Sequence, residues 1–522
     1  MSHRRVAIQP EVARQPTFLR ALWDKDARKR PLWSALGTEE FDDSARTRYP
    51  QRMSSKEATL RRFDGQPVLL FVLGSMAGCA GENSAPASGK PLATDIPTAT
   101  SEAPSAGLTP GGSAGPGASA SAAPAGAAAP ADLNVLMISI DALRSDHMAF
   151  SGHNPEVMPT LNAFEKTAVS YTKFRALSSF TSQTLGGFLG CRYPSELMRS
   201  GSFFGAYPDA ELLFPELLQK AGVRTMSAHA HFYFAKDKSN FQQGFDQYEI
   251  VPGLKKSNTT DENISSPAHT EIALKHLADK ANTGGRFFAW YHLLDAHDQY
   301  MTHETGKSFG KSSVQKYDGE LYFVDQHVKK IFDFVDAEPW GKRTMIIVTA
   351  DHGEAFGEHK QYRHGFELWD TVIHVPLMIR APGVAPRRVD EPRGMIDLCP
   401  TILESFGVKP EAGFQGTSLW PELRGEKVGP RDVISDLSRT SDNDRRRTLL
   451  RGDYKLIELG DGDGYQLFNV AKDPGELDDL SKKEKPMRAT MIEAMKASSK
   501  TIKEICPKRR DHLVGKKPGK DC

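Results

Sequence analysis

Three stretches of the chain are almost wholly apolar and show no alternation of apolar and polar positions. They are Asn134–Ile140, Phe287–Leu294 and Thr344–Ala350. Runs of this kind are typical of strands covered on both faces, as in a parallel sheet. The first run ends directly before Asp141 and the third directly before Asp351. Because ligands gather at the carboxyl ends of strands in open α/β sheets, we expect these two acids to act together.

Segments with helical periodicity separate the predicted strands. One predicted helix is Thr270–Ala281 and a second is Asp318–Asp336. Strands that alternate with helices predict an α/β fold with a mostly parallel central sheet flanked by helices. Six apolar residues of the second helix fall on one face, namely Leu321, Val324, Val328, Ile331, Phe332 and Val335.

The first 79 residues do not have the pattern of a globular domain. Residues 53–79 read as a secretory signal, with two arginines before a short apolar run and small residues before Cys79. The apolar run is too short to span a bilayer. Met76-Ala77-Gly78-Cys79 resembles a bacterial lipobox, which implies lipidation of Cys79. Residues 1–52 are an uncertain extension, and we expect translation to start at Met53. For the apolar run before Cys79, the alternative to a signal is a buried strand that ends in a structural cysteine.

Residues 80–131 are almost all Ala, Pro, Gly, Ser and Thr. Such a segment cannot bury enough apolar surface to offset its chain entropy, so it is predicted to be a flexible tether. A lipid-anchored protein needs such a spacer to stand clear of the membrane. The signal, the cysteine and the tether therefore support one another.

Charge bears on the expected partners of the chain, and the cysteines bear on its metal sites and disulfides. The formal net charge is +1 and the pI is about 7.7, which gives no reason to expect nucleic acid as a partner. The five cysteines form no CxxC pair and no zinc-type spacing. An oxidising compartment would allow a Cys506–Cys522 disulfide. Cys191 is interpreted as structural.

Acids, a histidine and hydroxyl groups fall at the ends of the expected elements. Asp351 and His352 could both reach one divalent ion from a strand end, although a turn without metal is the alternative. Asp141 is another candidate ligand, or a helix N-cap. Thr181-Ser182 precedes a short apolar helix. A nucleophile there would gain from the helix dipole and the free N–H groups; N-capping is the alternative.

Two further segments carry pairs of histidines. His292 lies near the end of the second apolar run and His297 follows that run, while His359 and His364 follow Asp351. A single histidine is more often structural than catalytic. Two such segments, one of them directly after an Asp-His-Gly motif, make a functional role more credible.

The order of these elements resembles the sulfatase family within the alkaline-phosphatase superfamily. The resemblance covers roughly residues 133 to 482. It is most specific in the D-H-G-E-x-x-G-E-H block from Asp351 to His359 and in the C-terminal block. The other matching motifs are Arg192-Tyr193-Pro194, the H-x-x-D-x-H segment from His292 to His297, His364-Gly365, Val375-Pro376-Leu377, Asp397–Thr401, Tyr454–Ile457, Gln466–Asn469 and Lys472–Glu476.

The resemblance implies an alkaline-phosphatase-like sandwich at 132–430 and a small C-terminal antiparallel sheet, with a basic tail, at 431–522. It implies a divalent ion (Mn, Zn, Ca or Mg), with one ion expected and two as the alternative. His229 and His231 fall near another substrate-side basic group of relatives. The implied metal ligands are Asp141, Thr181, Asp351 and His352, and the implied catalytic residues are Thr181, His297, His364 and, with less support, His292.

One departure from the family bears on the chemistry. Sulfatases typically carry C-x-P-x-R, or a Ser version, whose first residue is oxidised to formylglycine. Thr181 stands at that position here, with Gln183 and Leu185 in place of the Pro and Arg. Threonine is not a substrate for that oxidation in the family. It instead resembles members that handle phosphate, phosphonate or phosphoglycerol groups.

The sequence thus predicts a metal-dependent hydrolase, or transferase, that cleaves phosphate, phosphonate or sulfate esters through Thr181. The alternatives are a true sulfuric ester hydrolase and a non-catalytic, surface-tethered homologue. The expected substrate is a small-molecule, lipid-headgroup or glycan ester. The expected location is the cell envelope, where a lipid on Cys79 would hold the protein on a membrane facing the periplasm or the exterior.

Overall fold

The computed structural model of the protein describes residues 132–255, 264–303 and 307–505. Its centre is an eight-stranded sheet, and five of the seven neighbouring strand pairs are parallel. The predicted α/β fold with a mostly parallel sheet is therefore confirmed. In spatial order the strands are β11 (Arg387–Val389), β2 (Val169–Tyr171), β10 (Leu377–Arg380), β7 (Thr344–Ala350), β1 (Asn134–Ile140), β6 (Phe287–Leu293), β4 (Arg224–His229) and β5 (Gln247–Ile250).

The three apolar runs form the middle of this sheet. Strands β7, β1 and β6 lie side by side, and every residue in them is buried. Two of the three have the predicted bounds, and β6 ends one residue earlier than predicted. A strand that is covered on both faces has no polar side to expose, which is why these runs show no alternation.

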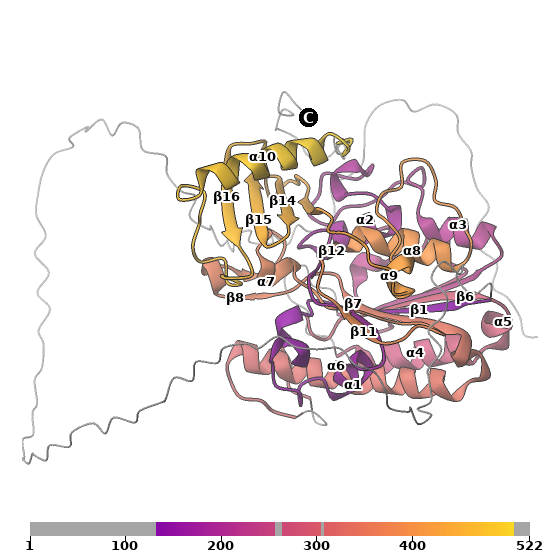
Figure 1. The fold of residues 1–522 in the computed structure, drawn as a ribbon. Helices are drawn as coiled ribbons and strands as arrows, with labels where there is room; N and C mark the ends of the chain where they lie inside the picture. The colour runs from indigo at the N-terminus through magenta and orange to yellow at the C-terminus, as the bar shows by residue number, and fades with distance from the viewer. Residues whose placement is uncertain (1–131, 256–263, 304–306, 506–522) are drawn as a thin grey trace, which may run out of the picture. The chain divides into compact units, whose positions relative to one another are not determined.

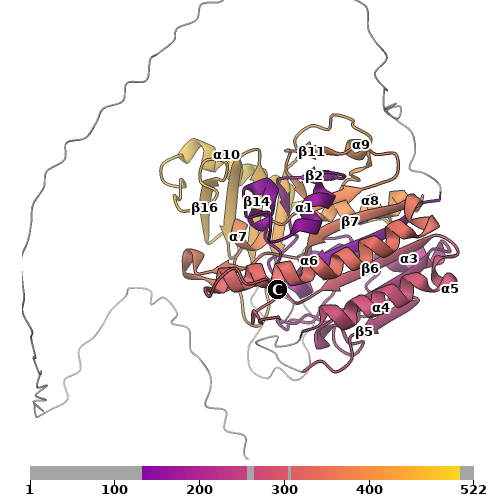
Figure 2. The ribbon, with the colours of Figure 1, turned by 90° about the horizontal axis from the view of Figure 1, so that it is seen from below.

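Helices cover both faces of the sheet, as Figure 1 shows, and Figure 2 shows α4 and α6 running across one of them. That face carries α1 (Pro159–Glu165), α4 (Ser266–Ala278) and α6 (Ser313–Ala337). The opposite face carries α2 (Thr181–Gly190), α3 (Phe214–Lys220), α8 (Leu398–Ser405) and α9 (Trp420–Leu423). No helix among the described residues is both long and apolar enough to cross a bilayer.

Both predicted helices exist, but their ends lie elsewhere. Helix α6 begins five residues before the predicted start, because Ser312 caps it and Gln315 completes a capping box. Helix α4 ends at Ala278, because Asp279 has an extended backbone and caps the next short helix by accepting a hydrogen bond from the Ala281 N–H.

A four-stranded antiparallel sheet follows in the C-terminal part, as predicted. Helix α10 (Lys485–Ser499) packs on its strands β14 and β15 (Figure 1). The sheet consists of β13 (Val433–Leu437), β14 (Arg446–Arg451), β15 (Tyr454–Leu459) and β16 (Gly464–Asn469). Smaller elements are the ladders of β3 (Phe174–Arg175) with β12 (Arg393–Gly394) and of β8 (Ala355–Phe356) with β9 (Tyr362–Arg363), the helices α5 (Lys280–Thr283) and α7 (Asp370–Ile373), and the 3₁₀ turn η1 (Ser145–His147).

Cys191, which was interpreted as structural, forms a disulfide. It lies at the end of α2, and its partner Cys399 lies near the start of α8. The two residues are 208 positions apart in the sequence. Cys79, Cys506 and Cys522, with the predictions made for them, lie outside the described residues.

A buried ionic network joins the C-terminal sheet to the main body. Asp370 accepts from Arg175 Nη2 at 2.6 Å and from Lys455 Nζ at 2.8 Å. The same Lys455 amine lies 2.8 Å from Glu476 Oε1. All four side chains are buried. Because each carboxylate depends on a cation from another element, β15 is held to α7 and β3 by charge as well as by packing.

Replacing the buried cation should therefore be costly. Lys455→Met leaves Asp370 and Glu476 in the interior with one cation fewer, so we expect a loss of about 3–5 kcal/mol in the free energy of unfolding. Urea denaturation followed by circular dichroism measures it. The control is Lys173→Met, which breaks a half-exposed pair with Asp453 and should cost about 0–1 kcal/mol. Equal losses in the two variants would contradict the role given to the network.

Candidate functional site

Strand register places the two predicted acids at one edge of the sheet. Strand β1 lies between β7 and β6, and Ile140 is paired with Ala350 on one side and Leu293 on the other. Asp141 and Asp351 are the next residues of two parallel neighbours, so both emerge at the carboxyl ends of their strands. The Asp141 N–H donates to the Leu293 carbonyl at 2.8 Å, which fixes the first turn after β1.

Asp141, Asp351 and His352 form a buried cluster with the donor set of a metal site. One ligand atom from each lies within 4.8 Å of the others. His352 Nε2 is 3.3 Å from Asp351 Oδ2 and 3.8 Å from Asp141 Oδ1. Neither of these two oxygens has a hydrogen-bond partner in the part of the chain that the structure describes. Two unsatisfied carboxylate oxygens in a buried site are costly unless a cation lies between them, so the cluster fits a divalent ion.

The protonation states favour the same interpretation. His352 Nδ1 lies 2.9 Å from the Gly353 carbonyl, which can only accept, so Nδ1 carries the proton and Nε2 is free in the neutral ring. Burial lowers the pKa of His352, which keeps the ring neutral. Burial would raise the pKa of Asp141, but the hydrogen bond from His292 and the nearby histidines hold it below its usual range. A neutral imidazole and an ionised carboxylate are the forms that bind metals.

Thr181 is the first residue of α2, and its hydroxyl faces the cluster. Its Oγ1 lies 2.9 Å from His352 Nε2, so the hydroxyl donates to the free nitrogen of the neutral ring. The side chain is only partly buried, which leaves it accessible from outside. The N-terminus of α2 adds N–H groups and a partial positive charge beside this oxygen. A hydroxyl at this position can act as a nucleophile toward an anionic ester.

Two other residues of α2, Gln183 and Leu185, contact the C-terminal sheet and the hydrophobic core. The Gln183 side chain donates to the Ser438 carbonyl at 3.1 Å and accepts from the Ser438 N–H at 2.8 Å, next to strand β13. Leu185 belongs to the hydrophobic core. The positions where the family motif has Pro and Arg thus join the helix to the C-terminal sheet and to the core.

His364 and His297 lie together on one side of the cluster. The His364 ring stacks on His352 at 4.0 Å between centroids, and the His297 ring is 5.1 Å from His364. Burial would lower the pKa of His364, but the charge and hydrogen bond of Glu354 raise it. The Nδ1–H of His364 reaches Glu354 Oε1 at 3.1 Å. Both histidines thus lie beside His352, which contacts the Thr181 hydroxyl, and their catalytic roles stay predictions.

His292 lies against the carboxylates. Its Nε2 is 3.1 Å from Asp141 Oδ2 and its Nδ1 is 2.8 Å from Ser139 Oγ. Because a carboxylate can only accept, the His292 Nε2–H donates to Asp141, and in the neutral ring Nδ1 accepts from the Ser139 hydroxyl, which itself accepts from Trp290 Nε1 at 2.9 Å. The fully buried ring therefore orients a candidate metal ligand. Its predicted part in catalysis remains open.

The two upstream histidines differ from each other. His229 is fully buried, stacks on Phe234 at 4.3 Å and bonds to Ser227 Oγ, so it belongs to the interior. His231 is partly buried, and its Nδ1 accepts from the Tyr233 N–H at 3.1 Å. Burial, together with the charge of His297, lowers the pKa of His231 to about 4. Both lie near His292, since the His229 ring is 6.4 Å from the His292 ring between centroids, but only His231 is partly exposed.

Sequence reasoning assigned no role to three residues that build this site. Glu354 orients His364, Ser139 orients His292, and Arg144 Nη1 donates to the Glu354 carbonyl at 2.9 Å. Glu354 follows Asp351 in the Asp-His-Gly-Glu motif, which is a signal that could have identified it. Ser139 and Arg144 carry no comparable signal, because their partners come from other segments.

Comparison with known proteins agrees with this architecture. The family model described as Sulfatase matches residues 133–408, and the model described as N-sulphoglucosamine sulphohydrolase, C-terminal, matches residues 357–504. The Delta 4,5-hexuronate-2-O-sulfatase of Bacteroides thetaiotaomicron is 30% identical over 169 residues. That alignment covers 30% of this chain and 35% of the relative, so the chain spans about a third of that relative's length.

Solved structures share the fold at low sequence identity. A 2-O GAG sulfatase superposes with a TM-score of 0.60 at 17% identity, covering 71% of this chain and 92% of that one. The phosphonate monoester hydrolase of Agrobacterium radiobacter gives a TM-score of 0.59 at 17% identity, covering 71% and 96%. Since the first family model alone matches more than half of the 522 residues, this chain belongs to the sulfatase family.

Proposed function

We propose that this chain is a hydrolase, or a transferase, of phosphate, phosphonate or sulfate esters that uses Thr181 as its nucleophile. The observation that carries the proposal is the 2.9 Å contact between Thr181 Oγ1 and His352 Nε2, beside two carboxylate oxygens that have no partner among the described residues. A hydroxyl, a neutral imidazole and two carboxylates from three separate segments meet at one point. A purely structural cluster would have no need to leave these oxygens unsatisfied.

Asp141, Asp351, His352 and Thr181 are the residues that would hold a divalent ion. Such an ion supplies positive charge that lowers the pKa of a hydroxyl and neutralises an anionic ester. Ala142 N–H and His352 N–H both donate to Asp351 Oδ1, at 3.3 and 3.0 Å. These bonds leave the other oxygen of Asp351 directed at the cluster.

The reaction follows from the positions of the side chains. Thr181 Oγ1 gives its proton to solvent water and forms a bond to the phosphorus or sulfur atom, while the bond from that atom to the ester oxygen breaks. His297 or His364 donates a proton to the departing alcohol. The N–H groups at the start of α2 stabilise the charge on the remaining oxygens. Water, or a second alcohol, then releases the group from Thr181.

The identity of the nucleophile favours phosphorus over sulfur. Formylglycine releases sulfate by elimination from its second hydroxyl group, whereas a threonyl sulfate must be cleaved by water. The phosphonate hydrolase with the same fold and the hexuronate sulfatase relative represent the two candidate chemistries. A true sulfatase is therefore the second candidate, supported by the names of the relatives, and a glycan, lipid-headgroup or small-molecule ester remains the substrate class. A non-catalytic homologue is the remaining alternative, and it has no need of a metal.

The proposed location is the cell envelope, through a lipid on Cys79. Its support is the sequence alone: the signal-like run before Cys79 and the Ala/Pro/Gly/Ser-rich segment at 80–131. Neither segment lies among the described residues.

The nucleophile can be tested with a matched pair of variants. Thr181→Ala should lower kcat by at least about a thousandfold, since the attacking oxygen is lost. Ser182→Ala removes the adjacent hydroxyl, which bonds to the Phe203 carbonyl at 3.3 Å, and should keep kcat within about tenfold. Both are compared with the full chain by steady-state kinetics and thermal unfolding. If Thr181→Ala turned over normally, another nucleophile would have to be sought.

The substrate class can be tested side by side on the full chain. With added Mn²⁺ or Zn²⁺, we expect release from p-nitrophenyl phosphate, its phosphodiester or a phosphonate monoester, and loss of that release with EDTA. Release from p-nitrophenyl sulfate alone would favour the sulfatase and contradict the preference for phosphorus. No release from any of them, with no bound metal, would favour the non-catalytic alternative.

Metal binding can be tested without any substrate. Asp141→Asn should weaken Mn²⁺ binding by at least about tenfold, because an anionic ligand becomes a neutral amide. Titration calorimetry on metal-stripped protein measures it. Asp146→Asn is the control, since this carboxylate belongs to the same loop but is held by Arg144 at 2.6 Å, outside the cluster. Equal affinity in the Asp141 variant and the control would exclude Asp141 as a ligand.

A further inference from the structure

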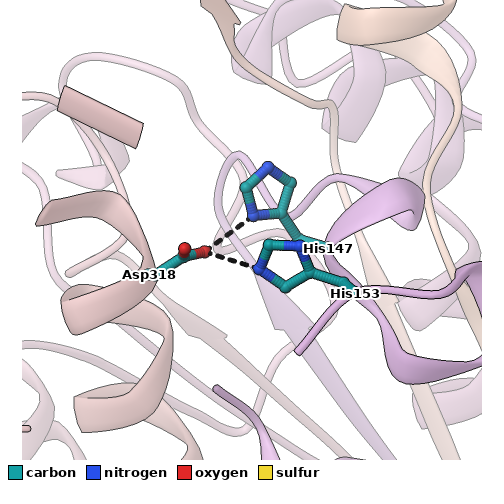
Figure 3. A group of neighbouring side chains, drawn as sticks. All are labelled: His147, His153 and Asp318. Carbon is teal, nitrogen blue, oxygen red and sulfur yellow. Dashed lines mark hydrogen bonds and ion pairs between the residues drawn. The ribbon is translucent and has the colours of Figure 1, made fainter. Parts of the chain in front are cut away.

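A second group of metal-type side chains lies outside the site described above. His147, His153 and Asp318 point toward one another from three places in the chain, as Figure 3 shows. His147 ends the turn η1, His153 lies in the loop that follows it, and Asp318 lies in α6. Among the described residues, this group and the Asp141 cluster are the two sets of three whose ligand atoms lie within 4.8 Å of one another.

Both imidazoles converge on a single carboxylate oxygen. His147 Nδ1 is 2.8 Å from Asp318 Oδ1, and His153 Nε2 is 3.0 Å from the same atom. The two rings are 4.3 Å apart between centroids. One oxygen that binds two ring nitrogens needs a proton on each of them in the absence of a metal. An ion would replace both protons and would itself bridge the three groups.

We infer that His147, His153 and Asp318 form a second metal site, which binds Zn²⁺. Two imidazole nitrogens and one carboxylate oxygen match the three-protein-ligand sets of zinc, which leave a fourth position for water. The Asp141 cluster has more oxygen ligands than nitrogen ligands, so the two sites should differ in preference.

The adjustment needed to take up the ion is small. Tetrahedral ligands about 2.0–2.1 Å from zinc lie about 3.4 Å apart. The two nitrogen–oxygen separations here are 2.8 and 3.0 Å. The rings therefore have to move away from Asp318 by about half an ångström, which side-chain rotation can supply.

Packing fixes two of the three ligands and leaves access through the third. The His147 ring meets the Tyr317 ring edge-on at 4.9 Å, and its side chain is 6% exposed. Asp318 is 10% exposed and is held on the longest helix of the fold. His153 is 23% exposed, so the ion can enter from its side. Preorganised ligands beside an open edge are what a binding site requires.

The site would reinforce the turn that carries Asp141. The Tyr317 hydroxyl donates to the Ala142 carbonyl at 2.7 Å and accepts from the Arg144 N–H at 3.1 Å. Tyr317 thus holds the start of segment 142–153 to α6, and an ion bound by His147, His153 and Asp318 would hold its middle and its end. Binding of the ion would not depend on the proposed reaction.

Zinc stoichiometry tests the inference directly. The full chain is stripped with a chelator, incubated with Zn²⁺ alone, freed of excess metal and analysed by mass spectrometry for zinc per chain. His153→Gln should lose one equivalent relative to the parent chain. Asp318→Asn should lose the same equivalent, which covers the case in which one of the variants folds poorly; circular dichroism checks the fold of each.

A matched control comes from a histidine in a single pair. His276 Nε2 lies 2.9 Å from Glu249 Oε1, without a second imidazole, so His276→Gln should keep the full stoichiometry. With Co²⁺ in place of Zn²⁺, the visible bands of a tetrahedral ion should be weaker in His153→Gln than in the parent. An unchanged zinc content in folded His153→Gln, or an equal loss in His276→Gln, would overturn the inference.

A variant of the first cluster separates this inference from the proposed function. Asp351→Asn removes a ligand of the Asp141 cluster only. If it keeps the equivalent that His153→Gln loses, the second site stands whether or not the first binds zinc. If Asp351→Asn abolishes all zinc binding while His153→Gln removes none, the second site is excluded and the first is supported.

Discussion

Two carboxylates at adjacent strand ends impose the main electrostatic constraint on this fold. Asp141 and Asp351 are both fully buried, and each keeps an oxygen without a partner among the described residues. Like charges in a medium of low dielectric constant repel strongly, and desolvation adds to the cost. His292 donates to one of them and two backbone N–H groups to the other, but these bonds do not satisfy all four oxygens. The two carboxylates thus fit a cation between them, which would offset both costs.

The position of the two acids at the ends of neighbouring strands explains why the sequence could predict them. Asp141 and Asp351 follow strands whose burial is visible in uninterrupted apolar runs, and neighbouring parallel strands must end at the same edge. His352 and Glu354 come with Asp351 in one motif. The hydroxyl of Thr181 was predicted from its place at a helix start and from the family resemblance. Local pattern, sheet topology and the family resemblance together singled out Asp141, Asp351, His352 and Thr181, whereas Glu354 was given no role.

Other features depend on contacts that no local pattern records. The bond from Ser139 to His292 spans 153 residues, and the Cys191–Cys399 disulfide spans 208. His147 and His153 meet an aspartate more than 160 positions away, on a helix whose predicted start was that same residue. The predicted helix ends were wrong for a different reason. The caps at Ser312 and Asp279 are side-chain hydrogen bonds, which the spacing of apolar residues does not show. Periodicity locates the buried face of a helix and says little about its ends.

The placement of Gln183 bears on how a threonine could replace a modified residue in this family. Its amide bonds to Ser438 in both directions, so it fastens the first turn of α2 to the end of β13. The Arg447–Asp436 pair lies in the same sheet, and Asp436 in turn accepts from the Ser195 N–H at 2.8 Å, beyond the end of α2. The C-terminal sheet therefore holds α2 near its start through Gln183, and the segment that follows α2 through Ser195. The hydroxyl that we propose as the nucleophile is therefore carried by a helix that contacts of the C-terminal sheet hold in place.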